Sequence, residues 1–93
     1  MVVLILESVA PGLRGEITRW MIQPRAGVFV GKVSAMVRDK LWEKVQRAAK
    51  RGSGILLYSS NAEQGFSVRT FGDPSRELID IEGVILSRLH RKG

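Results

Sequence analysis

Blocks of apolar and polar positions divide the chain into short predicted elements. Residues 2–6 are continuously apolar, as in a central strand covered by helices, and Glu7 is the first polar residue after them. Pro11 suits the first turn of a helix, which Pro24 would end. Four apolar residues between these prolines follow one helical stripe: Leu13, Ile17, Trp20 and Met21. We therefore expect a buried strand, then a helix, with Glu7 where the strand ends.

A second helix is predicted over residues 34–51, after a short strand at 28–30 that lies between two glycines. Ser34 is suited to cap this helix, and Gly52 to end it. Its apolar stripe consists of Val37, Leu41, Val45 and Ala48. Only one short strand therefore fits between the two helices, so the sheet order around residues 28–30 stays open.

The last third of the chain is predicted to be strands and loops. Residues 54–60 are mostly apolar and residues 66–71 alternate with period two, which indicates a β-hairpin with one wet face. A loop at 72–76 and a short apolar segment at 78–81 follow, and the run 84–89 is predicted to be a strand. The expected element order is β-α-β-α-β-β-β.

This order favours an α+β sandwich of the ferredoxin-like type, with two helices on one face of a mostly antiparallel sheet. Residues 1–93 form one domain, in which 84–93 are the C-terminal strand and a basic tail. A strand at 84–89 would leave an apolar face exposed, so we expect it to pair with a partner chain. A symmetric homodimer satisfies both copies at once.

The amino-acid composition limits the classes of partner that the chain is expected to bind. Fifteen Lys and Arg against nine Asp and Glu give a net charge of +6 and a sequence pI of about 10.5, which favours a polyanion. A basic surface without such a partner is the alternative. The sequence has no cysteine, which excludes disulfides and thiolate metal sites and agrees with a cytoplasmic protein. The N-terminal apolar run is too short for a membrane span, so no membrane association is expected.

Few residues are suited to catalysis. The single histidine, His90, has no partner set by spacing, and we interpret it as an exposed tail residue rather than a catalytic one. Gly-rich phosphate loops are absent from the sequence. Glu7 could hold Mg²⁺ if a second carboxylate, such as Glu7 of a dimer partner, completed the site. Alternatively, Glu7 pairs with Arg14 or a helix N-terminus and has a structural role only, which is the favoured interpretation.

The basic side chains indicate a function more clearly than the catalytic candidates do. Arginine forks match phosphate oxygens, and each neutralised phosphate releases counterions. The candidates for phosphate contact are Arg14, Arg19, Arg25, Lys32, Arg38, Lys40, Arg69 and Arg76. Trp20 and Trp42 fit helix stripes and are expected in the core, so base stacking on them is not predicted. The pattern therefore favours recognition of a duplex backbone with little sequence specificity.

The chain closely resembles the CRISPR-associated family Cas two, in particular its subtype I-E branch. The resemblance runs nearly end to end, and its most specific part is Arg-Ala-Gly-Val-Phe-Val-Gly at 25–31, followed by Val-Ser-Ala at 33–35. Further matching pieces are Glu7, Leu13-Arg14-Gly15, Trp20, Trp42-Glu43, Asn61, Glu63, Gly65-Phe66, Thr70-Phe71-Gly72 and residues 80–83. Their common order and spacing make coincidence improbable.

The resemblance implies a ferredoxin-like homodimer that bridges two dimers of the integrase Cas one during spacer acquisition. Such a dimer lies across the double-stranded protospacer DNA, and Arg14 and Arg76 correspond to contacts with its phosphate backbone. Arg19 and Arg38 are further DNA-binding candidates. Subtype I-E members often carry two adjacent arginines where this chain has Ser75 and Arg76. The C-terminal region corresponds to the part that docks on the integrase, through Val84, Leu86 and Leu89.

Two other functions are consistent with the sequence. Some family members are described as magnesium-dependent nucleases of single-stranded RNA or double-stranded DNA that use an aspartate at the end of the first strand. Glu7 occupies that position here, so it is the catalytic and metal-binding candidate of this alternative, which alone would need Mg²⁺. The third interpretation is an RNA-binding module with exposed sheet aromatics such as Phe66 and Phe71. The favoured interpretation is the architectural DNA-binding adaptor.

Overall fold

The computed structural model is built on a five-stranded antiparallel sheet. It describes residues 1–8, 10–48, 52–60 and 65–90. The strands are β1 (Val2–Glu7), β2 (Ile22–Arg25), β3 (Val28–Gly31), β4 (Ser53–Ser59) and β5 (Phe66–Phe71). Their order across the sheet is β2-β3-β1-β4-β5, and each neighbouring pair is antiparallel. The strand that begins the sequence therefore lies at the centre of the sheet.

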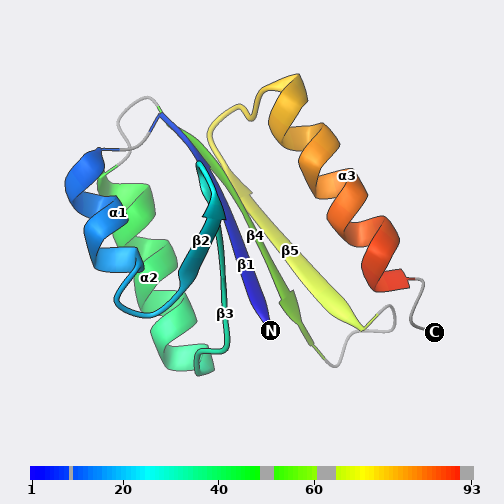
Figure 1. Cartoon of the computed structure of the whole chain (residues 1–93), viewed down its shortest axis with the longest axis horizontal. Coiled ribbons are helices and arrows are strands. Elements are labelled where there is room, and N and C mark those ends of the chain that lie inside the picture. Colours follow the sequence, from blue (N-terminus) through cyan, green and yellow to red (C-terminus); the bar gives the residue numbers. More distant parts are fainter. Residues whose placement is uncertain (9, 49–51, 61–64, 91–93) are drawn as a thin grey trace.

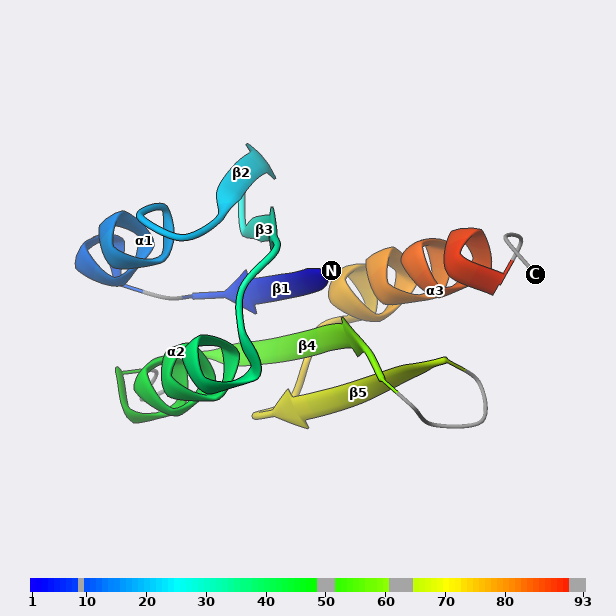
Figure 2. The ribbon, with the colours of Figure 1, turned by 90° about the horizontal axis from the view of Figure 1, so that it is seen from below.

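Helices cover both faces of this sheet. They are α1 (Pro11–Ile17), α2 (Ala35–Ala48) and α3 (Arg76–His90). Figures 1 and 2 show α1 and α2 together on one face and α3 alone on the other. The architecture is an α+β fold consistent with the ferredoxin-like type, so the predicted class and the pair of helices on one face are confirmed.

Burial on both faces explains why the run at 2–6 is continuously apolar. Alternate residues of β1 point to opposite sides, so Leu4 belongs to the core beneath α1 and α2 while Ile5 belongs to the core beneath α3. The buried residues beneath α1 and α2 are Val2, Leu4, Leu6, Leu13, Ile17, Met21, Phe29, Leu41, Trp42, Val45 and Leu56. Those beneath α3 are Val3, Ile5, Val28, Ile55 and Leu57.

The segment between α1 and α2 settles the sheet order that the sequence left open. It forms a hairpin of two strands, β2 and β3, so the predicted helix reaching Pro24 is wrong: α1 ends at Ile17. Pro24 lies within β2, an edge strand, where its missing N–H costs no internal sheet bond. Gly27 makes the turn with φ of 79°, and a Cβ there would lie 2.6 Å from the Leu6 carbonyl oxygen.

The C-terminal strand predicted over residues 84–89 is also wrong, because this run lies within α3. Short apolar runs do not distinguish a strand from a helix by periodicity alone. Here Ile81 and Ile85 are one helical turn apart and, with Leu86, pack against the buried residues on the α3 side of the sheet. The predicted basic tail is wrong at Arg88 and His90, which lie within α3, and residues 91–93 lie outside the described part of the chain.

The other predicted elements agree with the structure where it describes them; residues 49–51 of the second predicted helix lie outside the described part of the chain. The Ser34 Oγ accepts a hydrogen bond of 3.2 Å from the backbone N–H of Val37, which caps α2 as expected. β4 and β5 form the predicted hairpin, with Ser59 opposite Phe66. Trp42 is buried, and its ring packs edge-on against Phe71 with centroids 5.2 Å apart. Trp20, in contrast, is 54% exposed, so its predicted place in the core is wrong.

Candidate nucleic-acid interface

Glu7 ends β1 and is held by neutral hydrogen-bond donors. Its Oε1 accepts a bond of 3.1 Å from the Ser53 hydroxyl, at the start of β4, and one of 3.2 Å from the backbone N–H of Ser75. The Ser75 carbonyl in turn accepts the first helical bond of α3, from the N–H of Ile79. One carboxylate therefore joins β1, β4 and the beginning of α3.

These hydrogen bonds affect the ionisation of Glu7. They stabilise the charged carboxylate and lower its pKa, with the Ser75 side chain as the largest cause and partial burial opposing the shift. The predicted structural role for Glu7 named Arg14 or a helix N-terminus as the partner. The observed partners are Ser53 and the backbone N–H of Ser75, so the helix N-terminus that binds Glu7 is that of α3 and not that of α1.

Two arginines from different elements surround the same end of β1. Arg14 projects from α1 and Arg25 from the end of β2, and both line a pocket of about 390 Å³ together with Glu7. Both side chains belong to exposed residues, and in the described part of the chain no ion pair engages either one. Exposed guanidinium groups without such an ion pair can donate hydrogen bonds to phosphate oxygens.

Arg76 lies next to this pocket in the fold, because it directly follows Ser75. Its side chain is 90% exposed, and its nearest carboxylate, that of Asp80, is 3.7 Å away on the same helix face. An exposed pair of this kind contributes about 0–1 kcal/mol, so the Arg76 guanidinium is readily available to another anion. Figure 1 shows that the starts of α1 and α3 lie at the same end of the sheet.

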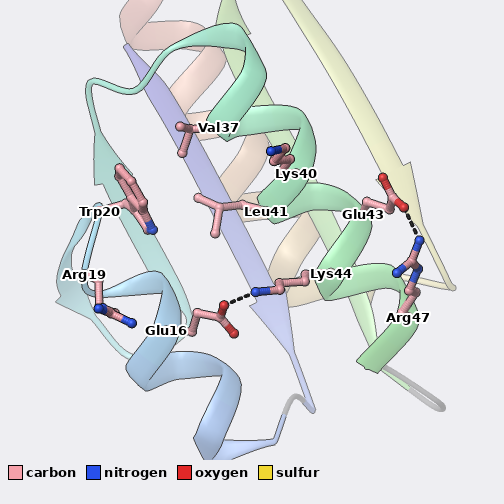
Figure 3. A pocket seen from close by; sticks show the side chains of 9 residues that line it. All are labelled: Glu16, Arg19, Trp20, Val37, Lys40, Leu41, Glu43, Lys44 and Arg47. Carbon is pink, nitrogen blue, oxygen red and sulfur yellow. Dashed lines mark hydrogen bonds and ion pairs between the residues drawn. The ribbon is translucent and has the colours of Figure 1, made fainter.

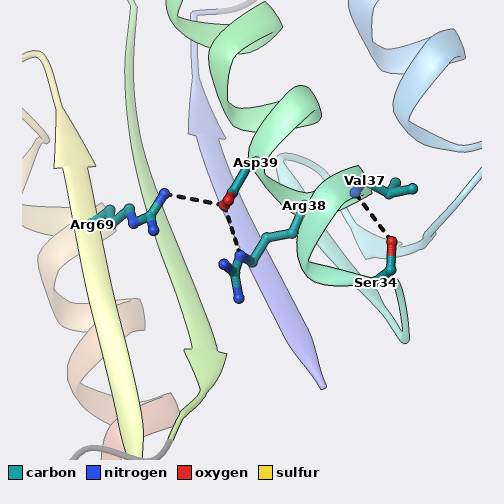
Figure 4. Close-up of polar contacts among 5 residues, drawn as sticks. All are labelled: Ser34, Val37, Arg38, Asp39 and Arg69. Atoms are coloured by element: carbon teal, nitrogen blue, oxygen red, sulfur yellow. Dashed lines mark hydrogen bonds and ion pairs between the residues drawn. The ribbon is translucent and has the colours of Figure 1, made fainter.

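Arg38, by contrast, lies at the opposite end of β1. It donates a 2.9 Å bond to Asp39, and its guanidinium carbon lies 3.8 Å from the centroid of the Tyr58 ring. Arg69 on β5 donates to the same Asp39 oxygen at 3.2 Å (Figure 4). Tyr58 pairs with Val2, five residues before Glu7, so about 17 Å of strand separates the two ends. The structure therefore does not bring Arg38 together with Glu7.

The other predicted site residues are dispersed. Arg19 follows α1 and lines a separate pocket against α2. Val84 is exposed on α3, whereas Leu86 packs against the sheet. Leu89 belongs to the backbone of α3, and its side chain lies outside the described part of the structure. Val84 and Leu86 therefore do not present one common docking surface.

Ser53 and Ser75 are the site residues that sequence reasoning missed as partners of Glu7. They are 46 and 68 residues away from it along the chain, so no local pattern links them. The sequence contained only an indirect signal: Ser53 directly precedes the apolar run at 54–60, and Ser75 lies in the loop predicted at 72–76. Serine is common at such places because its hydroxyl oxygen can accept from a free backbone N–H, and the hydroxyl group can also donate to a carboxylate.

The donor set of one copy does not complete a magnesium site. Mg²⁺ usually binds through one or two carboxylates together with phosphate oxygens and waters, and among the described residues that line this pocket Glu7 is the only carboxylate. Across the described residues, no group of three or more His, Cys, Asp or Glu could hold a metal ion. A cation at Glu7 would therefore need ligands from a second copy or from a phosphate.

Fold and site together define a small basic α+β protein in which two arginines, without an ion pair among the described residues, lie beside one hydrogen-bonded carboxylate. The family model of CRISPR-associated protein (Cas_Cas2CT1978) matches residues 1–86. The chain belongs to this CRISPR-associated family and is a Cas two-like protein. None of the helices in the described part of the chain is both long and apolar enough to cross a membrane.

Proposed function

We propose that this chain is a spacer-acquisition protein of the subtype I-E branch. In this proposal a homodimer bridges two dimers of the integrase Cas one and holds the protospacer DNA duplex by its phosphate backbone, without sequence specificity. Membership of the CRISPR-associated family and the net charge of +6 support this role. A cytoplasmic location follows from the same role.

The observation that carries the proposal is the state of the arginines around Glu7. Arg14 and Arg25 line one pocket without an ion pair among the described residues, and Arg76 is nearly fully exposed beside it. Backbone contacts position a duplex without reading its sequence, and free guanidinium groups are what such contacts require. The carboxylate at the centre is already engaged by two protein donors, which favours an architectural role for Glu7.

Apolar surface around α3 supports an assembly of more than one chain. Val84 is 57% exposed, and together with Ile81 and Pro24 it lines a largely apolar pocket of about 710 Å³ between α3 and the β2–β3 hairpin. Exposed apolar surface of this kind marks protein contacts. We assign it to the homodimer or to the integrase contact, in place of the strand pairing that the sequence predicted.

Charge reversal at Arg14 and Arg76 tests the proposal. The double variant Arg14→Glu, Arg76→Glu is expected to lose at least about 100-fold in duplex affinity, because two phosphate contacts become repulsive. Spacer acquisition in cells should fall with it. The matched control is Lys44→Glu combined with Arg47→Glu on α2, which changes the net charge equally away from this pocket, at two cations already paired with Glu16 and Glu43. Wild-type duplex binding and acquisition by the Arg14, Arg76 variant would refute the proposal.

A second candidate function is a magnesium-dependent nuclease acting on single-stranded RNA or double-stranded DNA through paired Glu7 residues. The observation in its favour is that Glu7 lines the same pocket as two arginines that could hold the scissile phosphate. The test is cleavage by purified protein with and without Mg²⁺. Loss of a magnesium-stimulated activity in Glu7→Gln would support the nuclease, and unchanged cleavage in that variant would assign the activity to a contaminant.

A further inference from the structure

Trp20 is held in an exposed position by the backbone around it. The backbone N–H of Trp20 donates to the Ile17 carbonyl at 2.9 Å. The backbone N–H of the next residue, Met21, donates to the same carbonyl at 3.0 Å, and the Met21 side chain is buried. Gly31 on β3 supports this turn closely, since a Cβ there would lie 3.1 Å from the Trp20 carbonyl oxygen. The indole is therefore placed on a fixed segment while half of its surface stays accessible.

Trp20 lines a pocket of about 690 Å³ between the end of α1 and α2 (Figure 3). Leu41 and Val37 of α2 form the apolar side that faces the indole, and Lys40 lies on the same helix. Arg19 lines the pocket beside Trp20. The volume is within the usual range of about 300–1,000 Å³ for small-ligand sites.

The charges of this pocket favour an anion. Four cations line it against two carboxylates, and both carboxylates are occupied: Glu16 pairs with Lys44, and Glu43 pairs with Arg47 (Figure 3). No ion pair in the described part of the chain engages Arg19 or Lys40. The pocket thus combines an aromatic surface with two cations that form no ion pair with any residue the structure describes.

A second hollow extends the same surface toward the β2–β3 hairpin. Trp20 and Arg19 also line this pocket of about 440 Å³, where Lys32 adds another cation and no carboxylate is among the lining residues described. An extended chain that carries one negative charge per unit would meet cations in both hollows, with the indole between them. A compact anion would occupy one hollow only, and an acidic peptide would not need the aromatic surface.

We propose that Trp20 is a stacking platform for the base of an unpaired nucleotide, and that Arg19, Lys40 and Lys32 hold the phosphates on either side. The ligand class is single-stranded nucleic acid, bound without base-edge readout, because every base offers a flat face for stacking. This site lies apart from the Glu7 pocket, and the inference does not depend on the proposed duplex contacts at Arg14 and Arg76.

The experiment is a fluorescence titration of the intact chain with an oligodeoxyadenylate of about five nucleotides, which matches the span of a small stacking site. Stacking is expected to quench the emission of exposed Trp20, while buried Trp42 provides a constant background. An abasic oligomer of the same length and charge should bind at least about tenfold more weakly, since a stacked base contributes roughly that much or more.

Three variants separate base stacking from non-specific electrostatic attraction. Because Trp20 and Met36 are both exposed, each variant should keep the thermal unfolding midpoint of the wild type. Affinity measured by the anisotropy of a labelled oligomer should fall about tenfold or more in Trp20→Leu and be largely kept in Trp20→Phe. Met36→Ala, at an apolar residue near the start of α2 that is also exposed, should leave the affinity unchanged. Equal binding of the abasic oligomer, or unchanged binding by Trp20→Leu, would overturn the proposal.

Two further arms identify the ligand. An oligoriboadenylate of the same length tests whether RNA or DNA is preferred, and binding of either one supports the site. A short peptide of alternating glutamate and leucine tests protein docking, in which a leucine at position 20 would serve as well as tryptophan. Peptide binding that survives Trp20→Leu, together with failure of both oligonucleotides, would replace the nucleotide site by a peptide site.

Discussion

The two ends of β1 carry similar residues in opposite arrangements. At the carboxyl end, Glu7 accepts hydrogen bonds from neutral serine donors, and the nearby Arg14 and Arg25 have no ion pair among the described residues. At the amino end, beside Tyr58, one carboxylate binds two arginines: Asp39 accepts from Arg38 and Arg69, and both guanidinium groups lie over the Tyr58 ring.

The difference shows that the number of arginines does not define a phosphate site; their partners do. Arginines already bonded to a carboxylate and an aromatic ring must give up those interactions before they bind another anion. Because serines donate the hydrogen bonds to the Glu7 carboxylate, the neighbouring Arg14 and Arg25 stay available to bind another anion. The Glu7 end is therefore the one we expect to contact a nucleic-acid backbone, and the Tyr58 end is the one we expect to stabilise the fold.

The largest predicted difference between the two ends is a stability effect at their glycines. Gly27, at the Glu7 end, and Gly65, at the Tyr58 end, both have positive φ, but only at Gly27 would a Cβ collide with backbone. Gly27→Ala should lower the free energy of unfolding by about 3 kcal/mol, from strain plus the collision with the Leu6 carbonyl. Urea denaturation measures this change.

Gly65→Ala is the matched control, because no residue that the structure describes lies within 4 Å of the position its Cβ would occupy. Its cost should be the conformational term alone, about 1 kcal/mol. Equal costs for the two substitutions would mean that the close approach of the β2–β3 turn to β1 does not exist in solution.

Releasing the arginines at the Tyr58 end should make the two ends more alike. Asp39→Ala removes the carboxylate shared by Arg38 and Arg69, so the salt dependence of duplex binding should steepen by about one unit of slope or more. The stability cost should be about 1 kcal/mol, because the Asp39 side chain itself is about half exposed. Glu82→Ala removes the same charge from α3 and is the control. An unchanged slope would show that this end cannot reach the duplex.

The smallest predicted effect is a pH dependence that both ends share. Hydrogen bonds hold the pKa of Glu7 below its ordinary value, and the bond from Arg38 does the same for the pKa of Asp39. A carboxyl with a lowered folded-state pKa stabilises the protein above its unfolded pKa, about 4, and this contribution is lost as pH falls through the folded value. Stability should therefore decline on acidification below about pH 5.

Glu7→Gln and Asp39→Asn should each remove part of this acid-dependent decline, and the double variant should remove more. Glutamine can still accept from Ser53 and Ser75, so the change tests the charge rather than the hydrogen bonds. Thermal unfolding followed between pH 3 and pH 7 measures the effect. A decline of the same size in the double variant would assign the acid sensitivity to other carboxyl groups.

Patterns along the chain predicted what depends on local periodicity. The buried β1, the capped α2 and the β4–β5 hairpin follow from apolar spacing and turn residues, and all three are confirmed. β2 was not predicted, because Pro24 was interpreted as the end of a helix, although a proline is equally acceptable on an edge strand. α3 was mistaken for a strand because its apolar run is short, yet Ile81 and Ile85 already had helical spacing.

The candidate site was predictable in position but not in partners. Glu7 was recognised because it is the first polar residue after a buried strand, and Arg14 because it follows at a helix start. Which donors satisfy Glu7 depends on a cross-strand register and on the start of α3, neither of which a local pattern contains. The exposure of Trp20 was missed for a related reason, since it follows from the end of α1 at Ile17.

The most direct test of the central claim is the salt dependence of duplex binding in two double variants of equal charge. Arg14→Ala with Arg76→Ala should reduce the slope of log K against log salt by about two, one for each phosphate that is no longer neutralised. Arg38→Ala with Arg69→Ala should reduce it by less than about one, because Asp39 and Tyr58 already hold these side chains. Equal reductions, or a larger one in the second variant, would contradict the account.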